Sequence, residues 1–241
     1  MNPIISVIIP AKDEEKAIEA TIKQFLPYKK KYSAEVIVSD GGSSDKTESI
    51  AKEYADRVVL SKGGKNTIAQ GRNMGAKKAR GNILIFIDGA IRVPDVPLLF
   101  ESALKVGRER ETAAATMDVF IYPWEEKTID RLMYVLGNLI VRLTLITGIY
   151  IVKGECQIIK KGYFDKVNGF NEKMVVAEDS DLYRRLAKLG KIVYLKKIKV
   201  YDSPRRFRQE GYIKSVWLYT INNLLALFGK KPVSKEWKPI R

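Results

Sequence analysis

The sequence predicts an α/β fold in which a mostly parallel central sheet carries helices on both faces. Short apolar runs alternate with helical segments along the first half of the chain, which is the order of a sheet built from strand–helix units. The runs are apolar at every position, as expected of strands buried on both faces. The chain has 241 residues, 46% of them hydrophobic, which is enough for the core of one such domain.

The composition excludes several classes of protein and of site. Cys156 is the only cysteine, which excludes a disulfide scaffold. The chain has no histidine, so a histidine general base and a histidine-ligated zinc site are excluded as well. A metal would be held mainly by oxygen, which favours Mg²⁺ or Mn²⁺. The net charge of +15 indicates an anionic partner: nucleic acid, anionic lipid or a phosphorylated small molecule.

Four strands and three helices are expected in the first half of the chain. The strands are the apolar runs at residues 4–9, 36–38, 57–60 and 83–87. The helices between them are expected at residues 13–27, 45–55 and 66–80. The first helix begins with acidic residues, which a helix N-terminus favours, and the second with a capping box of Asp45 and Glu48.

Each of three predicted strands is followed by an aspartate at its carboxyl end, namely Asp13, Asp40 and Asp88. In open α/β sheets, ligands bind beyond the carboxyl ends of the strands. Asp40 opens a glycine-rich turn that suits a nucleobase, a ribose or a phosphate, although it also suits a plain turn closed by the Asp40 side chain. Asp88 must meet solvent, a ligand or a metal, or cap the next loop, because burying an unpaired carboxylate is costly.

The second half is less regular. Strands are expected at residues 113–122 and 149–159, and a helix is expected to begin near Glu178. Three carboxylates crowd the start of this helix, and their repulsion raises at least one pKa, which makes Asp179 the best candidate for a general base. Further on, Arg205 and Arg206 follow a proline turn and suit bidentate binding of phosphate.

Two further segments, residues 132–146 and 213–228, have the apolar periodicity of amphipathic helices. Neither predicts a membrane span, because the uncharged runs are 10 residues on each side of Arg142 and 15 residues in the second segment, whereas a span needs about 20. With the basic charge, they favour a peripheral protein on an anionic membrane. Packing on the domain and a homodimer contact are the alternatives.

These motifs, in this order, resemble the inverting glycosyltransferases of family 2, which have the Rossmann-like GT-A fold. The resemblance extends from Ser6 to about Gly211. The matching segments are Ser6–Glu15, Asp40–Ser43, Gly71–Ala76, Phe86–Asp88, Gly162–Asn171, Glu178–Asp179 and Arg205–Phe207. The resemblance implies a catalytic domain of residues 1–211, with a donor half (1–110) and an acceptor half (111–211), followed by a helical extension (212–241).

The resemblance also implies roles for individual residues. Those expected to bind the nucleotide sugar are Pro10, Ala11, Glu14, Asp40, Gly41, Arg72, Asp88, Arg205 and Arg206. Arg72 is expected near the base or the diphosphate, and the two later arginines at the diphosphate. Asp179 corresponds to the catalytic base of the family. Glu178 and Gly154 are expected at the acceptor, although a plain turn also explains Gly154.

One departure from the family concerns the metal. Asp88 matches the start of the Asp-x-Asp metal motif, but Ala90 stands where its second aspartate belongs. Either Asp88 holds Mg²⁺ or Mn²⁺ together with water and diphosphate oxygens, or arginines replace the metal. We favour the metal. A milder departure is Asp13, at a position where the family usually has asparagine.

The sequence therefore predicts transfer of a sugar from a UDP- or GDP-linked donor to a hydroxyl or phosphate, on a free or lipid-linked acceptor. A catalytically silent nucleotide-sugar-binding protein is the alternative. A nucleic-acid-binding protein is disfavoured, because no RNP-like, zinc-finger or helix-turn-helix motif is present. The apolar run at residues 4–9 is short, suits a buried strand and has no basic region before it, unlike a signal peptide. We therefore expect a cytoplasmic protein, peripheral at the inner face of the membrane.

Overall fold

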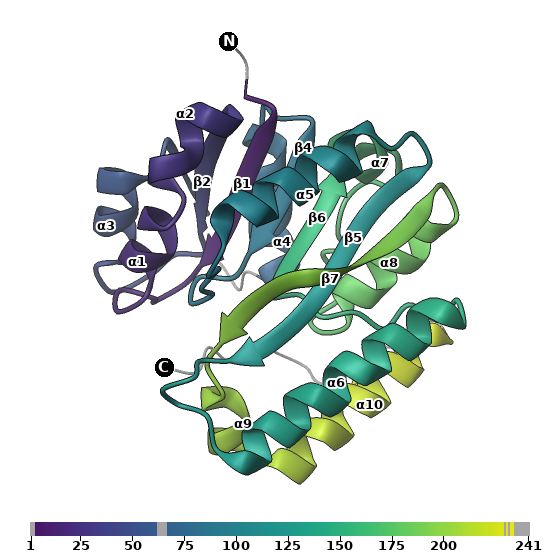
Figure 1. Ribbon diagram of the computed structural model, residues 1–241. Coiled ribbons are helices and arrows are strands. Elements are labelled where there is room, and N and C mark those ends of the chain that lie inside the picture. The colour runs from purple at the N-terminus through teal and green to yellow at the C-terminus, as the bar shows by residue number, and fades with distance from the viewer. Residues whose placement is uncertain (1–2, 62–66, 229, 231, 234–241) are drawn as a thin grey trace.

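The computed structural model describes residues 3–61, 67–228, 230 and 232–233 (Figure 1). Within these residues, seven strands form one sheet in the order β3-β2-β1-β4-β6-β5-β7. The strands are β1 (Ile5–Ala11), β2 (Ala34–Asp40), β3 (Arg57–Leu60), β4 (Ile83–Ile87), β5 (Thr112–Ile121), β6 (Cys156–Lys160) and β7 (Lys191–Asp202). All neighbouring pairs are parallel except those of β6, which runs antiparallel to β4 and β5. The predicted mostly parallel sheet is confirmed.

Helices cover both faces of this sheet. One face packs on α1 (Ile18–Lys23), α3 (Thr47–Tyr54) and α5 (Val96–Arg108). The other packs on α4 (Ile68–Lys78), α7 (Lys161–Lys166) and α8 (Glu178–Ala187). Side chains of β1 alternate between the two cores: Val7 and Ile9 belong to the first and Ile8 to the second. This burial on both faces explains why the strands are apolar throughout.

The first predicted helix is wrong at its N-terminus. Helix α1 begins at Ile18 rather than near Asp13 and is followed by η1 (Leu26–Tyr28) and α2 (Lys29–Tyr32). The amides of residues 13–15 instead donate to side chains of the second turn, namely Ser43, Thr47 and Asp45. Because Asp13 has a positive φ of 51°, the chain cannot be helical there, and this left-handed conformation is one that asparagine and aspartate tolerate best.

The capping box predicted at Asp45 and Glu48 is also wrong. Asp45 Oδ1 accepts from the amide of Thr47, two residues on, and its other oxygen from the amide of Glu15. A capping box is present at the start of α4 instead, between Thr67 and Gln70. Asn66, where that helix was expected to begin, lies outside the described residues.

The strand predicted at residues 149–159 is present only in its last part, as β6. Before it, the amides of Ile151 and Val152 donate to the side chains of Thr144 and Ser180. Side-chain partners therefore replace the strand ladder in this segment.

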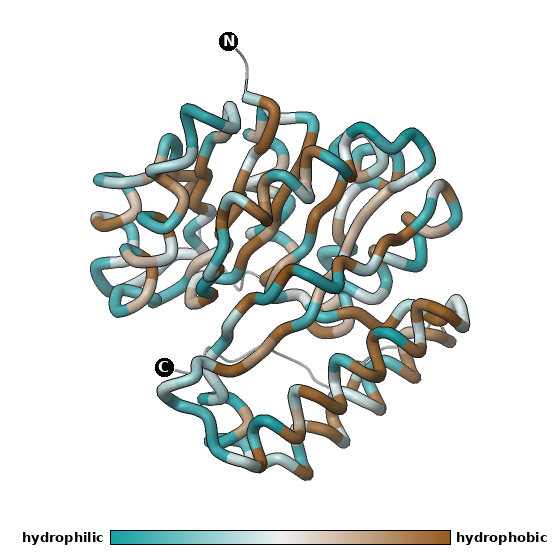
Figure 2. The backbone as a smooth tube through the Cα atoms, viewed as in Figure 1, coloured by the Kyte–Doolittle hydropathy of each residue, from teal (hydrophilic) through white to brown (hydrophobic). Residues whose placement is uncertain are grey.

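Three helices follow in the second half of the chain, namely α6 (Thr128–Ile146), α9 (Arg205–Glu210) and α10 (Tyr212–Leu227). Helix α6 packs on β5, where Asn138 bonds both backbone groups of Val119. Helices α6 and α10 overlap in the view of Figure 1, and the hydroxyl of Tyr212 at the start of α10 donates to Asp130 of α6. Both carry apolar residues outside the sheet's two cores (Figure 2). Within the described residues, no helix combines the length and the apolar character needed to cross a membrane.

Candidate active site

The carboxyl ends of β1, β2 and β4 meet at one edge of the sheet, where Ala11 pairs with Asp40 and the amide of Asp88 donates to the carbonyl of Glu155 at 3.1 Å. A cavity of about 650 Å³ opens at this edge. All but one of the residues predicted for the site line it, namely Pro10, Ala11, Glu14, Gly41, Arg72, Asp88, Gly154, Glu178, Asp179, Arg205 and Arg206. The topology thus brings together residues that are up to 196 positions apart, the separation of Pro10 and Arg206.

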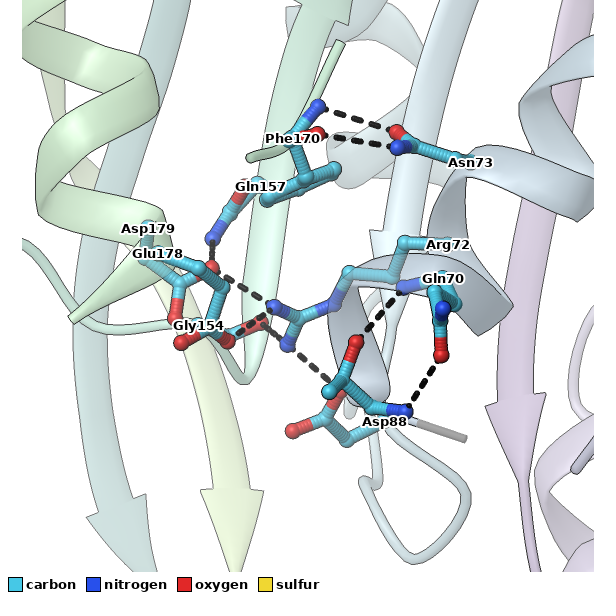
Figure 3. Close-up of polar contacts among 10 residues, drawn as sticks. Gln70, Arg72, Asn73, Asp88, Gly154, Gln157, Phe170, Glu178 and Asp179 are labelled. Atoms are coloured by element: carbon cyan, nitrogen blue, oxygen red, sulfur yellow. Dashed lines mark hydrogen bonds and ion pairs between the residues drawn. The ribbon is translucent and has the colours of Figure 1, made fainter. Parts of the chain in front are cut away.

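Arg72 occupies the centre of the site, with 1% of its side chain exposed (Figure 3). Its Nη1 donates to Glu178 Oε1 at 3.0 Å and to Asp179 Oδ1 at 2.7 Å. Its Nη2 donates to Asp88 Oδ1 at 2.9 Å and to the carbonyl of Gly154 at 3.0 Å. One guanidinium therefore joins the candidate metal ligand to the candidate base. A contact between Arg72 and the base or the diphosphate stays a prediction.

Helix α4 presents Arg72 because it lies unusually close to the sheet. A Cβ atom on Gly75 would meet Ile8 Cγ2 at 2.4 Å and Ser39 Oγ at 2.6 Å. Only glycine permits this approach. The capping box at Thr67 fixes the start of the helix, so Arg72, one turn on, is directed toward the carboxyl edge.

Asp179 lies in the first turn of α8 and is held from two sides. Besides Arg72, the amide of Gln157 on β6 donates to its Oδ1. A Cβ on Gly154 would come within 2.4 Å of Asp179 Oδ2 and 2.8 Å of Arg72 Nη2. The missing side chain of Gly154 therefore makes room for the carboxylate itself.

Three ionisable groups of the site have shifted pKa values. Burial raises the pKa of Asp88, although Arg72 opposes the shift. Burial also raises the pKa of Glu178 well above its usual range, and the adjacent Asp179 adds to the effect. The pKa of Arg72 is raised as well, because the three carboxylates outweigh the effect of its burial. The guanidinium therefore keeps its charge.

Asp40 is the one predicted site residue that does not line the cavity. It is buried, and its Oδ1 accepts from the amides of Gly42 and Ser43, both at 2.7 Å. This is the turn-closing role that the sequence also allowed. Its other oxygen, Oδ2, is buried and has no hydrogen-bond partner among the residues that the structure describes. A contact between Asp40 and a base stays a prediction.

The two predicted arginines enter the cavity from the start of α9. Arg205 Nη2 donates to Glu14 Oε1 at 2.7 Å, which ties the C-terminal part of the chain to the loop after β1. Arg206 Nη1 donates to Glu210 Oε1 at 2.8 Å. Both arginines line the same cavity as the carboxylates bonded to Arg72.

Residues 6–167, more than half of the chain, match the family model described as Glycosyl transferase family 2. The chain belongs to this family. It is 28% identical over 197 residues to the succinoglycan biosynthesis protein ExoA of Rhizobium meliloti, a match that covers 78% of this chain and 59% of the relative. It is 31% identical over 110 residues to the human dolichyl-phosphate beta-glucosyltransferase, covering 39% and 34% of the two chains.

The fold is that of solved glycosyltransferases. The mannosyltransferase PcManGT from Pyrobaculum calidifontis, solved in complex with GDP-Man and Mn²⁺, superposes with a TM-score of 0.71 at 18% sequence identity. That match covers 95% of this chain and 64% of the mannosyltransferase. The chain therefore spans about three fifths of the length of ExoA and of PcManGT. The predicted family and GT-A fold are confirmed.

The residues present fit a metal that protein and substrate hold jointly. Asp88 lines the cavity with 31% of its side chain exposed, and its Oδ1 alone is engaged by Arg72. Ala90 is buried, and its carbonyl accepts from Tyr122. Among the described residues, no three carboxylates or cysteines are arranged to hold a metal ion. One carboxylate together with diphosphate oxygens suits Mg²⁺ or Mn²⁺. The described residues do not fit a metal site formed by protein ligands alone.

Four further polar residues of the site were missed from the sequence. Glu155, Lys153 and Asp202 line the cavity, and Gln157 contacts Asp179. Asp202 ends β7 as Asp40 ends β2, so the rule that found the other aspartates would have found it. Gln157 is a polar residue in an otherwise apolar strand, and such a residue indicates a buried polar contact. Burial raises the pKa of Glu155 to about 7 and that of Asp202 to about 6.

Proposed function

We propose that the protein is an inverting glycosyltransferase that moves a sugar from a UDP- or GDP-linked donor to a hydroxyl or phosphate of an acceptor. The observation that carries this proposal is one cavity in which Asp88, Asp179 and Arg205 meet, each from a different part of the chain. Family membership supports it. In our proposal, residues 1–110 bind the donor, residues 111–211 bind the acceptor, and residues 212–241 are an extension.

In the proposed reaction, Asp179 takes the proton of the acceptor hydroxyl. The acceptor oxygen forms a bond to the anomeric carbon while the bond from that carbon to the diphosphate oxygen breaks, and the nucleoside diphosphate leaves from the opposite face. Arg72 and Gln157 hold the Asp179 carboxylate by its Oδ1, which fixes the direction in which it accepts the proton. Gly154 keeps the space around this carboxylate open, and Glu178 borders the acceptor.

The leaving diphosphate carries negative charge that the site must stabilise. Arg205 and Arg206 supply two positive charges on the cavity wall. Asp88 would hold Mg²⁺ or Mn²⁺, and the bound ion would offset the charge on the diphosphate. Pro10, Ala11, Glu14 and Gly41 border the same space and would surround the nucleotide.

Calorimetric titration with UDP, GDP and their common sugars tests this proposal. We expect one nucleotide to bind, and to bind more tightly with Mn²⁺ or Mg²⁺ than with EDTA. Binding that survives EDTA would assign the charge-balancing role to the arginines alone. Absence of binding by folded protein would refute the proposal, and binding without turnover on any acceptor would favour the silent sugar-nucleotide binder.

We further propose that the protein works at the inner, anionic face of a membrane. Large apolar residues of α6 and α10 are exposed, including Leu132, Leu143 and Ile213, and the net charge is +15. Such surfaces suit an anionic bilayer. Flotation with anionic liposomes at low salt tests the idea, and protein that stays at the bottom of the gradient would refute it. Sedimentation would reveal a homodimer through the same surface.

A further inference from the structure

The cavity does not end at the carboxylates but continues between α6 and α10. On that side its lining is apolar, formed by Leu136, Ile140 and Val141 of α6 and by Val216 and Leu224 of α10. The two helices are joined at one end by the hydrogen bond from the hydroxyl of Tyr212 to Asp130. We call this part of the cavity, bounded by these five residues, the apolar groove.

Side chains of the apolar groove remain accessible to water. Ile140 is 49% exposed and Leu224 44% exposed, although both line the cavity. Exposed apolar surface of this kind costs about 25 cal/mol per Å² relative to a covered state. A sugar or another polar acceptor would not recover that free energy, whereas a hydrocarbon chain would.

Lys153 connects the groove with the site of reaction. It precedes Gly154, which lies against Asp179. Its Nζ donates to Asn138 Oδ1 on α6 at 2.8 Å, and it lines the cavity. It is one of five basic residues that line a cavity whose other end is apolar, together with Lys12, Arg72, Arg205 and Arg206. A ligand with an anionic head and an apolar chain matches both ends.

We propose that the apolar groove binds the hydrocarbon chain of a lipid acceptor, with the hydroxyl or phosphate head of the lipid directed toward Asp179. This inference rests on the proposed function, because it names the class of acceptor for the same site. The groove and the carboxylates belong to one continuous cavity, so a single amphipathic molecule reaches both.

Neighbouring residues of α6 separate this proposal from its alternatives. Leu139 and Leu143 are 48% and 52% exposed, as exposed as Ile140, but do not line the cavity. A bilayer surface or a second copy of the chain resting on the outside of α6 would contact Leu139 and Leu143. A lipid chain inside the groove would contact Ile140 and Leu224.

The experiment measures binding of farnesyl phosphate to the full chain, with inorganic phosphate as the comparison. Two double variants are prepared, Ile140→Gln with Leu224→Gln in the groove and Leu139→Gln with Leu143→Gln outside it. We expect farnesyl phosphate to bind at least about 30-fold more tightly than inorganic phosphate. The groove variant is expected to lose about tenfold in affinity for it and the outside variant less than about twofold.

Titration of the same proteins with UDP and GDP keeps this test separate from the proposed function. Unchanged nucleotide affinity in both variants shows that they are folded. If the nucleotide binds but farnesyl phosphate binds no better than inorganic phosphate, the lipid proposal is overturned while the proposed function stands. Equal losses of affinity for farnesyl phosphate in both variants also overturn the lipid proposal. They would assign the apolar residues of α6 and α10 to a bilayer or a dimer contact instead. If no nucleotide binds, the proposed function itself fails.

Discussion

At the scale of single residues, the site depends on one buried cation. Arg72 is bonded to Asp88, Glu178 and Asp179, and a buried arginine is stable only with such partners. The sequence predicted that Arg72 belongs to the site, because it lies in a recognisable motif. It did not predict its contacts, since nothing in the chain indicates that residues 72 and 179 are neighbours. The aspartates were easier to predict, because the end of a strand is visible in the sequence.

Asp179→Asn tests the proposed base. Asparagine preserves the size of the side chain and an oxygen for Arg72, but it does not take up a proton. We therefore expect release of nucleoside diphosphate in the presence of acceptor to fall by at least about a thousandfold, with nucleotide affinity within a few-fold of wild type. Asp181→Asn, on the same helix and paired with Arg185, is the control and is expected to keep its activity. Near-normal turnover of the Asp179 variant would end the assignment.

Gly154→Ala tests whether the position of the carboxylate matters. The added methyl group would lie 2.4 Å from Asp179 Oδ2, so the carboxylate must move. A displacement of about 1 Å costs on the order of 100-fold in rate. We expect kcat to fall by about this factor while the affinity for the nucleotide changes little. A steady-state comparison with wild type measures both, and an unchanged kcat would show that the site tolerates the shift.

At the scale of elements, the sequence predicted what depends on local pattern. Strand β3 at residues 57–60 and strand β4 at residues 83–87 match the predicted bounds, because an apolar run bounded by turn residues is a local signal. The late start of α1 and the short β6 were not predictable in this way. In both, backbone amides donate to side chains that are distant in sequence, such as Ser43 and Ser180. The antiparallel direction of β6 is likewise a property of the assembled sheet.

Two glycines of α4 form a matched pair for testing how closely this helix must pack. A Cβ on Gly75 would meet Ile8 Cγ2 at 2.4 Å, whereas one on Gly71 would meet only Pro10 Cβ, at an ordinary 3.5 Å. We expect Gly75→Ala to destabilise the protein by about 1–3 kcal/mol through overpacking. Gly71→Ala is expected to be neutral or to stabilise by up to about 1 kcal/mol, because alanine favours the helix. Urea unfolding measures both, and equal effects would contradict the close approach.

At the scale of the whole molecule, charge is distributed unevenly. The chain carries 43 basic and 28 acidic residues, yet acidic side chains from β7, α8 and the loops after β4 and before β6 gather around one cavity, namely Asp88, Glu155, Glu178, Asp179 and Asp202. Burial raises the pKa values of several of these groups. The same cavity is also lined by basic side chains, among them Arg72, Arg205 and Arg206. Ionisable groups whose pKa values burial has shifted are typical of a functional site.

The raised pKa of Asp202 predicts a pH dependence of the stability of the protein, and Asp202→Asn should remove it. Burial raises the pKa of Asp202 from 3.8 to about 6, so between these values the folded protein binds a proton that the unfolded chain has lost. The contribution of Asp202 to stability therefore falls as the pH rises through this range and stays low above it. Asparagine does not ionise and still accepts the hydrogen bond that Tyr134 donates to Asp202. We expect the variant to be more stable than wild type by about 2 kcal/mol at pH 8 and equal to it near pH 4.

Urea unfolding at pH 4, 6 and 8 measures this difference, with Glu53→Gln on the exposed face of α3 as the control. The control is expected to follow the wild-type profile, because the side chain of Glu53 is exposed to water. If the Asp202 variant is more stable than wild type by the same amount at every pH, the difference arises from packing rather than from ionisation. A gain in stability that appears only as the pH rises through the range from about 4 to 6 would identify the ionised Asp202 carboxylate as its source.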